Sequence, residues 1–309
     1  MGPTASGKTE LAIFLTKHLP CDIISVDSAM VYQGMDIGTA KPSAEILAMA
    51  PHRLIDIRDP INSYSVAQFV EDAYAEIQAI HTAGRIPLLV GGTMLYFNSL
   101  IKGLSDIPTA NAEIRQTLDK QAAEIGWAAM HQQLTTIDPQ AAKQIHPNDS
   151  QRIQRALEVY IASGRSITAW RSETKVQRWL YPTIKLILAP TERSILHENI
   201  AKRFNIMLEQ GFIEEVEQLF NRPDLNTSLP SMRCVGYRQV LHYLEGKLDY
   251  TDLPEKAIIA TRQLAKRQLT WLRSLDDVTW FDNQNPDLNM KVLNLLSPIG
   301  MDKTLAFRR

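Results

Sequence analysis

The chain has 309 residues, of which 45% are hydrophobic and 22% charged, and its formal net charge at pH 7 is −1. These values are typical of a globular protein with one large domain or two smaller ones. A near-neutral chain has no global positive field, so any nucleic-acid surface has to be a local patch. No apolar run is long enough to cross a membrane. The two cysteines, Cys21 and Cys234, fit no zinc or redox spacing, which predicts a reducing cytoplasm and thiols that only pack.

The first segment of the chain fits the phosphate-binding pattern G-x-x-x-x-G-K-[ST] and reads Gly2-Pro3-Thr4-Ala5-Ser6-Gly7-Lys8-Thr9. In such a loop the backbone N–H groups surround phosphate oxygens, and the following helix directs its positive end at the anion. Lys8 is expected to reach the terminal phosphates, and the Thr9 hydroxyl to ligate Mg²⁺. The sequence therefore predicts a loop that binds a diphosphate or a nucleotide.

The surroundings of this loop favour an α/β domain. Residues 9–19 have apolar residues at helical spacing, and residues 22–26 are rich in β-branched side chains, as in a buried parallel strand. A phosphate loop normally follows a buried strand, but only Met1 precedes this one. We therefore expect that about ten mostly apolar residues, which include the first strand, are missing at the N-terminus.

Asp27 follows the strand 22–26 directly, and ligands of open α/β sheets bind at the carboxyl ends of the strands. Asp27 is thus a candidate catalytic residue close to the phosphate loop. A structural Asp that caps a helix and a magnesium ligand are the alternatives for this carboxylate. Residues 31–64 are predicted to form a long loop, which in a compact domain is usually functional.

A helix, a strand and a second helix are expected next. Ser65 and Gln68 predict a capping box at the start of a helix that ends at Gly84. Residues 85–90 are predicted to be a strand, and Gly91-Gly92-Thr93 leads from it into a helix over 94–101. This order predicts a doubly wound parallel sheet of the P-loop type.

Residues 105–181 contain no convincing strand and are predicted to be an all-helical insertion, with helices over 112–125, 127–136, 139–145 and 150–163. The core domain then comprises residues 1–104 and 182–309. Arg152 and Arg155 lie on one side of the last of these helices, and cations alternate with aromatic residues between 165 and 181. This composition suits RNA binding by charge and stacking. An ordinary solvated face has the same pattern and remains the alternative.

The C-terminal part is predicted to return to α/β order. A strand over 183–188 precedes helices over 190–210 and 212–220, a loop at 230–238 and a helix over 253–275.

The helix over 253–275 carries a basic stripe. At about 100° per residue, Arg262, Lys266 and Arg273 fall on one side of it. Its opposite side is expected to hold Ala257, Ala260, Leu264, Trp271 and Leu275. The stripe favours contact with a phosphate backbone, and a solubilising surface is the alternative.

Over most of its length, up to about Phe281, the chain resembles the bacterial tRNA dimethylallyltransferases, the isopentenyl-tRNA transferase family. Besides the phosphate loop, the resemblance rests on Ser25-Val26-Asp27-Ser28, Met35-Asp36-Ile37-Gly38-Thr39-Ala40-Lys41-Pro42, Pro51-His52-Arg53-Leu54, Val90-Gly91-Gly92-Thr93-Met94-Leu95-Tyr96, His146-Pro147-Asn148-Asp149 with Arg152 and Arg155, Val235-Gly236-Tyr237-Arg238, and Thr261-Arg262-Gln263-Leu264-Ala265-Lys266-Arg267-Gln268 with Trp271-Leu272-Arg273.

The resemblance implies a prenyl transfer. The dimethylallyl group of dimethylallyl diphosphate moves to N6 of the adenosine just 3′ of the anticodon, in tRNAs that read codons beginning with U, and diphosphate is released. Mg²⁺ is the metal of the family. Asp27 is the implied base that accepts the N6 proton, and Thr93 is expected to orient Asp27 or the leaving oxygen.

The resemblance also implies a set of tRNA contacts. We expect the protein to be a monomer, and its cysteines predict a cytoplasmic location. The implied contacts are Asp27, Ser28, Ala29, Met30, Thr93, Arg115, Gln151, Arg152, Ile153, Gln154, Arg155, Met232, Arg233, Cys234, Val235, Gly236, Tyr237, Lys266, Arg267, Gln268, Leu269, Thr270, Trp271, Leu272 and Arg273.

Three other functions share some of these features. A small-molecule or nucleotide kinase also combines a phosphate loop with a helical lid, but here the strand before Gly91 ends in no acidic Mg²⁺ ligand. Prenyl transfer to free AMP would leave the helical insertion and the basic helix without a purpose. A non-catalytic RNA-binding protein would not need Lys8, Thr9 and Asp27 together.

Overall fold

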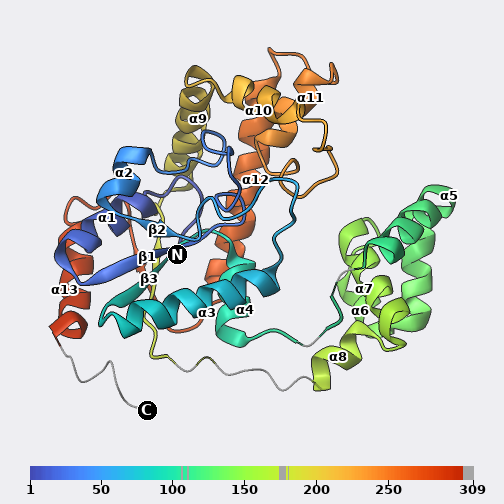
Figure 1. The fold of residues 1–309 in the computed structure, drawn as a ribbon, viewed down its shortest axis with the longest axis horizontal. Coiled ribbons are helices and arrows are strands. Elements are labelled where there is room, and N and C mark those ends of the chain that lie inside the picture. Colours follow the sequence, from blue (N-terminus) through green and yellow to red (C-terminus); the bar gives the residue numbers. More distant parts are fainter. Residues whose placement is uncertain (106, 110, 174–178, 180, 302–309) are drawn as a thin grey trace. The chain divides into compact units, whose positions relative to one another are not determined.

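The computed structural model describes residues 1–105, 107–109, 111–173, 179 and 181–301. The chain forms two compact units, Met1–Ser99 with Tyr181–Arg309, and Leu100–Leu180 (Figure 1). From the sequence, the boundaries were expected at 105 and 181. Each unit has a core of its own and is described by itself.

A parallel sheet lies at the centre of the first unit. Strand β1 (Cys21–Val26) pairs with β2 (His52–Arg53) on one side and β3 (Ile86–Gly91) on the other. The register of β1 and β3 runs from Cys21 opposite Ile86 to Val26 opposite Gly91, so both strands end at the same level. Their carboxyl ends therefore bring Asp27 and Gly92 to one edge of the sheet, and the predicted P-loop type of α/β fold is confirmed.

Helices α1 (Lys8–His18) and α3 (Val66–Thr82) both pack against β1 and β3. The predicted capping box is confirmed at the start of α3, where Ser65 and Gln68 exchange hydrogen bonds of 2.9 and 3.2 Å. The segment predicted as one long loop, 31–64, also contains a short helix, α2 (Ala44–Met49), besides β2. Helix α4 (Met94–Lys102) follows β3.

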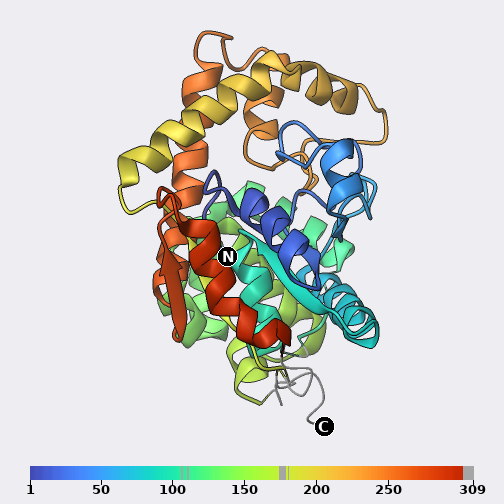
Figure 2. The same ribbon diagram turned by 90° about the vertical axis from the view of Figure 1, so that its left-hand side faces the viewer.

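A second parallel pair in the same unit joins β4 (Lys185–Leu188) to β5 (Val278–Phe281). Met1 lies beside β4, because its amino group donates to the Leu186 carbonyl (2.8 Å) and its carbonyl accepts from the Leu188 N–H (2.9 Å). Strand β5 was not predicted, since its middle residues are exposed and give no apolar run. Helix α13 (Leu288–Met301) packs against α1 (Figure 2).

Four helices complete the first unit: α9 (Arg193–Glu209), α10 (Phe212–Phe220), α11 (Tyr237–Leu244) and α12 (Leu253–Arg273). Helix α12 packs against α9 and α11, and α10 contacts α9 and α11. The predicted strand and helices of this region are all present, with ends that differ by a few residues.

In its described residues the second unit is all-helical, as predicted. It consists of α5 (Ala112–Ile137), α6 (Pro139–Gln144), α7 (Ser150–Ser163) and α8 (Ile167–Glu173). The two helices predicted on either side of Gly126 form one element with a break at this glycine, whose φ is 80°. Helix α8 was not predicted as a helix.

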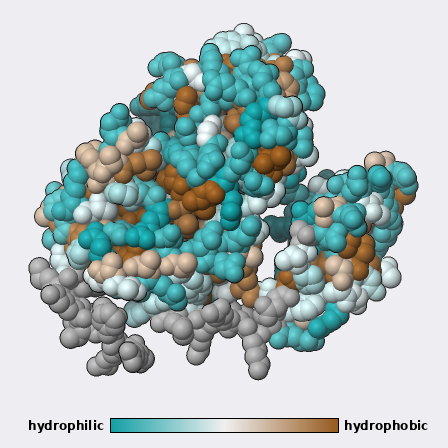
Figure 3. Space-filling model, in the orientation of Figure 1, coloured by the Kyte–Doolittle hydropathy of each residue, from teal (hydrophilic) through white to brown (hydrophobic). Residues whose placement is uncertain are grey.

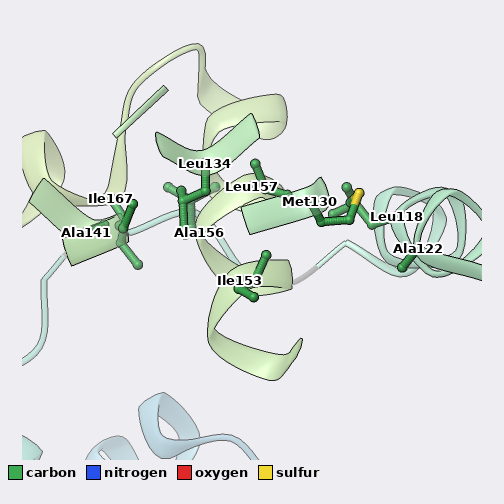
Figure 4. Packing of buried hydrophobic residues seen from close by; sticks show 11 residues of the cluster. Leu118, Ala122, Met130, Leu134, Ala141, Ile153, Ala156, Leu157 and Ile167 are labelled. Carbon is green, nitrogen blue, oxygen red and sulfur yellow. The ribbon is translucent and has the colours of Figure 1, made fainter. Parts of the chain in front are cut away.

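The core of this unit gathers side chains from all four helices, among them Leu118, Met130, Leu134, Ile153, Leu157 and Ile167 (Figure 4). On the face drawn in Figure 3, apolar residues form scattered patches between hydrophilic ones in both units. Among the described residues, no helix is both long enough and apolar enough to span a membrane.

Candidate active site

The phosphate loop turns between Met1 and α1. Gly7 has the left-handed conformation (φ 80°) and precedes α1 without a side-chain cap, so the first N–H groups of the helix remain available to an anion. The Ser6 hydroxyl donates to the Pro3 carbonyl (2.9 Å) and closes the loop. A Cβ on Gly2 would lie 2.3 Å from the Leu188 carbonyl oxygen, so only glycine fits there. These features give the loop the shape of an anion cradle.

Two cations converge on this loop. The Lys8 ammonium donates to the Pro3 carbonyl (2.5 Å), and the Arg203 guanidinium from α9 contacts the Thr4 hydroxyl. Burial, and then the charge of Arg203, lowers the pKa of Lys8 to about 7. Burial also lowers the pKa of Arg203. Two cations in one partly desolvated place favour an anion between them. Arg203 was not predicted, because it belongs to no motif and lies in the middle of a long helix.

Asp27 is the negative centre of the site. Its charge raises the pKa of Lys8 and of Arg203, and so opposes the effect of burial on both. Its Oδ1 accepts from the N–H groups of Ala29 (2.9 Å) and Met30 (3.3 Å), which fixes the carboxylate on its turn. No donor to Oδ2 is found among the described residues, so this oxygen is free to accept from a ligand.

Thr93 supports this turn through Ser28. The Thr93 hydroxyl accepts from the Ser28 N–H (3.0 Å) and lies 3.3 Å from the Ser28 hydroxyl, while the Thr93 N–H donates to the Val26 carbonyl (3.2 Å). Thr93 therefore positions the Asp27–Ser28 turn at the carboxyl end of β1.

A buried glutamine connects the two glycine-rich segments. Gln268 of α12 accepts from the Thr4 N–H (2.9 Å) and donates to the Gly92 carbonyl (2.8 Å). A Cβ on Gly92 would lie 2.6 Å from the Gln268 amide nitrogen, and one on Gly91 would lie 2.0 Å from the Val26 carbonyl oxygen. The backbone of β1 thus explains the glycine at position 91, and the Gln268 side chain explains the glycine at position 92.

The loop after Asp27 is held by the buried side chain of Lys41. The Lys41 ammonium donates to the Tyr32 carbonyl (3.0 Å) and forms ion pairs of 2.5 Å with Asp36 and Asp56. Only 3% of the Lys41 side chain is exposed, so this lysine serves the loop and not a ligand.

Glu215 of α10 fixes the next part of this loop. Its carboxylate accepts from the N–H groups of Asp36, Ile37 and Gly38 at 2.6 to 3.1 Å, and from the Tyr237 hydroxyl at 2.5 Å. Burial, and then the negative charge of Glu215, raises the pKa of Tyr237. The motif residues 36–41, for which the sequence suggested no role, therefore anchor the loop.

The donor atoms present fit magnesium bound together with a diphosphate. Among the described residues no cluster of three or more His, Cys, Asp or Glu side chains could hold a metal ion alone. Mg²⁺ in phosphate sites needs only one or two protein oxygens, because substrate phosphates and waters complete its shell. Thr9, next to Lys8 at the start of α1, supplies such an oxygen from its hydroxyl.

In the second unit, a buried carboxylate organises two of the predicted RNA-binding arginines. Glu158 is fully buried and accepts from Arg115 Nε (3.1 Å), from an Arg155 terminal nitrogen (2.8 Å) and from the Asn111 N–H (2.7 Å). Arg155 also donates to the Pro108 carbonyl (2.6 Å). Two guanidinium groups facing one carboxylate leave a net positive charge at this place.

The predicted tRNA contacts differ in their accessibility. Ten of them are exposed: Ser28, Arg115, Gln151, Arg152, Arg233, Lys266, Arg267, Thr270, Trp271 and Arg273. Trp271 is 39% exposed, although the helical pattern placed it opposite the basic stripe. Asp27, Ala29, Met30, Thr93, Gln154, Arg155, Cys234, Val235 and Leu269 are half-buried.

Six of the predicted contacts lie in the interior: Ile153, Met232, Gly236, Tyr237, Gln268 and Leu272. The side chains of the five residues other than Gly236 lie inside the protein, and the role of all six in tRNA binding stays a prediction. The two cysteines are free thiols, and burial raises the pKa of Cys21 to about 11 and that of Cys234 to about 12.

Together, the fold and this site define a P-loop-type α/β protein with an anion site next to a carboxylate. The sequence model described as IPP transferase matches residues 30–275, and the chain belongs to this family. Among curated proteins, the chain is 55% identical over 301 residues to the tRNA dimethylallyltransferases of two Coxiella burnetii strains, CbuG_Q212 and Dugway 5J108-111. The alignments cover 97% of this chain and 100% and 97% of these relatives.

Solved structures resemble the chain as well. The tRNA isopentenylpyrophosphate transferase of Bacillus halodurans is 38% identical, with a TM-score of 0.69 and coverage of 98% of this chain and 96% of that one. A eukaryotic dimethylallyltransferase, described as acting on tRNA, is 26% identical, with a TM-score of 0.80 and coverage of 96% and 77%.

Proposed function

We propose that this protein is an enzyme that transfers the dimethylallyl group of dimethylallyl diphosphate to tRNA and releases diphosphate. The observation that carries the proposal is the meeting of a phosphate loop, backed by Lys8 and Arg203, with the carboxylate of Asp27. The similarity to curated tRNA dimethylallyltransferases supports the same reaction and the same class of acceptor.

The phosphate loop serves the leaving group. As the bond between the allylic carbon and the diphosphate oxygen breaks, the electron pair leaves with diphosphate, and negative charge grows on its oxygens. Lys8, Arg203 and the first N–H groups of α1 are placed to stabilise this charge before the reaction starts. Bound Mg²⁺, held by Thr9 together with the diphosphate, would neutralise part of the same charge.

Asp27 serves the nucleophile. Adenine N6 is weakly nucleophilic, because its lone pair is delocalised into the ring. In our proposal Asp27 Oδ2 accepts a hydrogen bond from N6–H and takes this proton as the new C–N bond forms. The bonds from Ala29 and Met30 to Oδ1 hold the carboxylate in place, and Thr93 holds the turn on which it stands.

The acceptor is proposed to be the adenosine 3′-adjacent to the anticodon, in tRNAs that read codons starting with U. Bases of single-stranded loops are the least costly to extrude into an active site. The exposed cations of α12 and α7, among them Lys266, Arg267, Arg273 and Arg152, are proposed to bind the RNA backbone. We further propose that the enzyme acts as a monomer in the cytoplasm.

The test is a transfer assay with radiolabelled dimethylallyl diphosphate, Mg²⁺ and bulk bacterial tRNA, with AMP and ATP as alternative acceptors. Label in tRNA that is lost in Asp27→Ala supports the proposal. Label in AMP alone would assign a free nucleotide as the acceptor. Phosphoryl transfer from ATP without any prenyl transfer would contradict the proposal and favour a kinase.

A further inference from the structure

Gln268 lies on the helix with the basic stripe, yet its side chain points into the protein and is only 9% exposed. We propose that Gln268 is a positioning residue that holds the phosphate loop at a fixed distance from the segment leading to Thr93, and so shapes the diphosphate site. This inference rests on the proposed function, in which diphosphate is the leaving group.

Both polar atoms of the Gln268 side chain are in use. The carbonyl oxygen accepts from the Thr4 N–H (2.9 Å) inside the phosphate loop, and the amide nitrogen donates to the Gly92 carbonyl (2.8 Å). Gly92 precedes Thr93, which holds the Asp27 turn through Ser28. One side chain therefore connects the part of the site that binds the leaving group with the part that carries the base.

The phosphate loop is supported from two helices at the same residue. Gln268 of α12 bonds the Thr4 backbone, and Arg203 of α9 contacts the Thr4 hydroxyl. The neighbouring Ala5 packs against the apolar cluster that α9 and α12 share, which contains Leu196 and Ala265. A loop with a non-glycine residue at positive φ, as Ala5 has (φ 60°), needs such support to keep its shape.

The chemistry of this position requires a glutamine. A glutamate could accept from Thr4 but could not donate to Gly92, and an asparagine is shorter by one carbon–carbon bond, about 1.5 Å. The approach also requires Gly92, since a Cβ there would lie 2.6 Å from the Gln268 nitrogen. The two positions therefore form a matched pair.

The test uses two uncharged variants, Gln268→Met and Gln268→Asn, in the full chain. We expect the affinity for inorganic pyrophosphate with Mg²⁺, measured by calorimetry, to fall by about ten- to a hundred-fold, because the loop is no longer held in register. The affinity for tRNA, measured by filter binding, is expected to stay within about twofold, because Gln268 faces away from the solvent. A loss of fold alone would lower both affinities together.

The control is Gln263→Met, at an exposed position of the same helix, which we expect to leave both affinities unchanged. Gly92→Ala, which displaces Gln268 from the other side, is expected to weaken pyrophosphate binding as Gln268→Met does. Unchanged pyrophosphate affinity in both Gln268 variants would overturn the inference, as would a selective loss of tRNA affinity. If the wild-type protein binds no pyrophosphate, the proposed function fails and the inference fails with it.

Discussion

At the scale of single residues, the charge of Lys8 depends on what occupies the site. Its pKa is lowered from 10.5 to about 7, first by burial and then by Arg203. In the empty site at pH 8, Lys8 is therefore largely neutral, and a bound diphosphate stabilises its charged form. As the pH falls from 10.5 to 7, the unfolded chain takes up a proton that the folded protein does not, so the empty site destabilises the fold over this range.

This linkage predicts proton uptake when the anion binds. At pH 8, calorimetry of pyrophosphate binding in buffers of different ionisation enthalpy should show that the wild-type protein takes up more protons than Lys8→Arg, by about one per site. Arginine is the matched control, because it carries its charge at every pH in this range. Equal proton uptake by the two proteins would show that Lys8 is already charged in the empty site.

Asp27 allows binding and chemistry to be separated. Asp27→Asn keeps an oxygen that accepts from Ala29 and Met30 but cannot take a proton from N6. We expect kcat for prenyl transfer to fall by about 10²- to 10⁴-fold. Pyrophosphate affinity should not fall, since a negative charge has been removed next to the anion site. A variant with near-normal kcat would exclude Asp27 as the base.

At the scale of elements, sequence motifs predicted correctly those features that depend on residues close together in the chain. The capping box of α3 involves residues three apart in the sequence, and it forms as predicted. The pattern on α12 was less informative. This helix buries Ala257, Ala265, Gln268 and Leu272, while Trp271 is exposed. A hydrophobic pattern treats every aromatic residue as buried and every glutamine as exposed, so it cannot foresee a glutamine that bonds two loops.

Helix α7 gives a prediction whose sign is unusual. Removing a negative charge near an RNA surface normally strengthens RNA binding. For Glu158→Gln we expect the opposite, a several-fold weaker affinity for tRNA, because Glu158 holds Arg115 and Arg155 in place. The change should also destabilise the second unit by about 1–3 kcal/mol, since the buried acceptor of the bonds from Arg115, Arg155 and the Asn111 N–H loses its charge. Filter binding, at a temperature below the melting temperature of each variant, measures the affinity for tRNA. Thermal unfolding measures the loss of stability.

The matched control is Asp149→Asn, which removes an exposed carboxylate paired with Arg152 on the same helix. It should leave tRNA binding unchanged or slightly stronger, in line with the general charge effect. Tighter tRNA binding by Glu158→Gln would mean that Arg115 and Arg155 do not need their buried partner. Glu158 would then serve only the stability of the second unit and not tRNA binding.

At the scale of the whole molecule, the α/β order, the helical insertion and most element positions could be predicted from periodicity and turn residues. The long-range partners could not. Arg203, Gln268 and Glu215 reach sites far away in the sequence, and their roles follow from tertiary packing alone. The motifs located the phosphate loop and the turn at Asp27. They did not identify the side chains that hold these segments in place.

The two units have separate cores, so we expect that destabilising the second unit affects tRNA binding but not pyrophosphate binding. Leu134 is fully buried in the core of the second unit. Leu134→Ala should destabilise that unit by about 2–5 kcal/mol. Because the phosphate loop, Lys8 and Arg203 all belong to the first unit, pyrophosphate affinity should stay within about twofold of wild type, while tRNA affinity falls as the second unit loosens. Hydrogen exchange should accordingly rise in α5 and α7 and stay unchanged in β1 and β3. Equal loss of protection in both units would show that they unfold together. The site formed by Lys8, Arg203 and Asp27 would then depend on the helical unit for its stability.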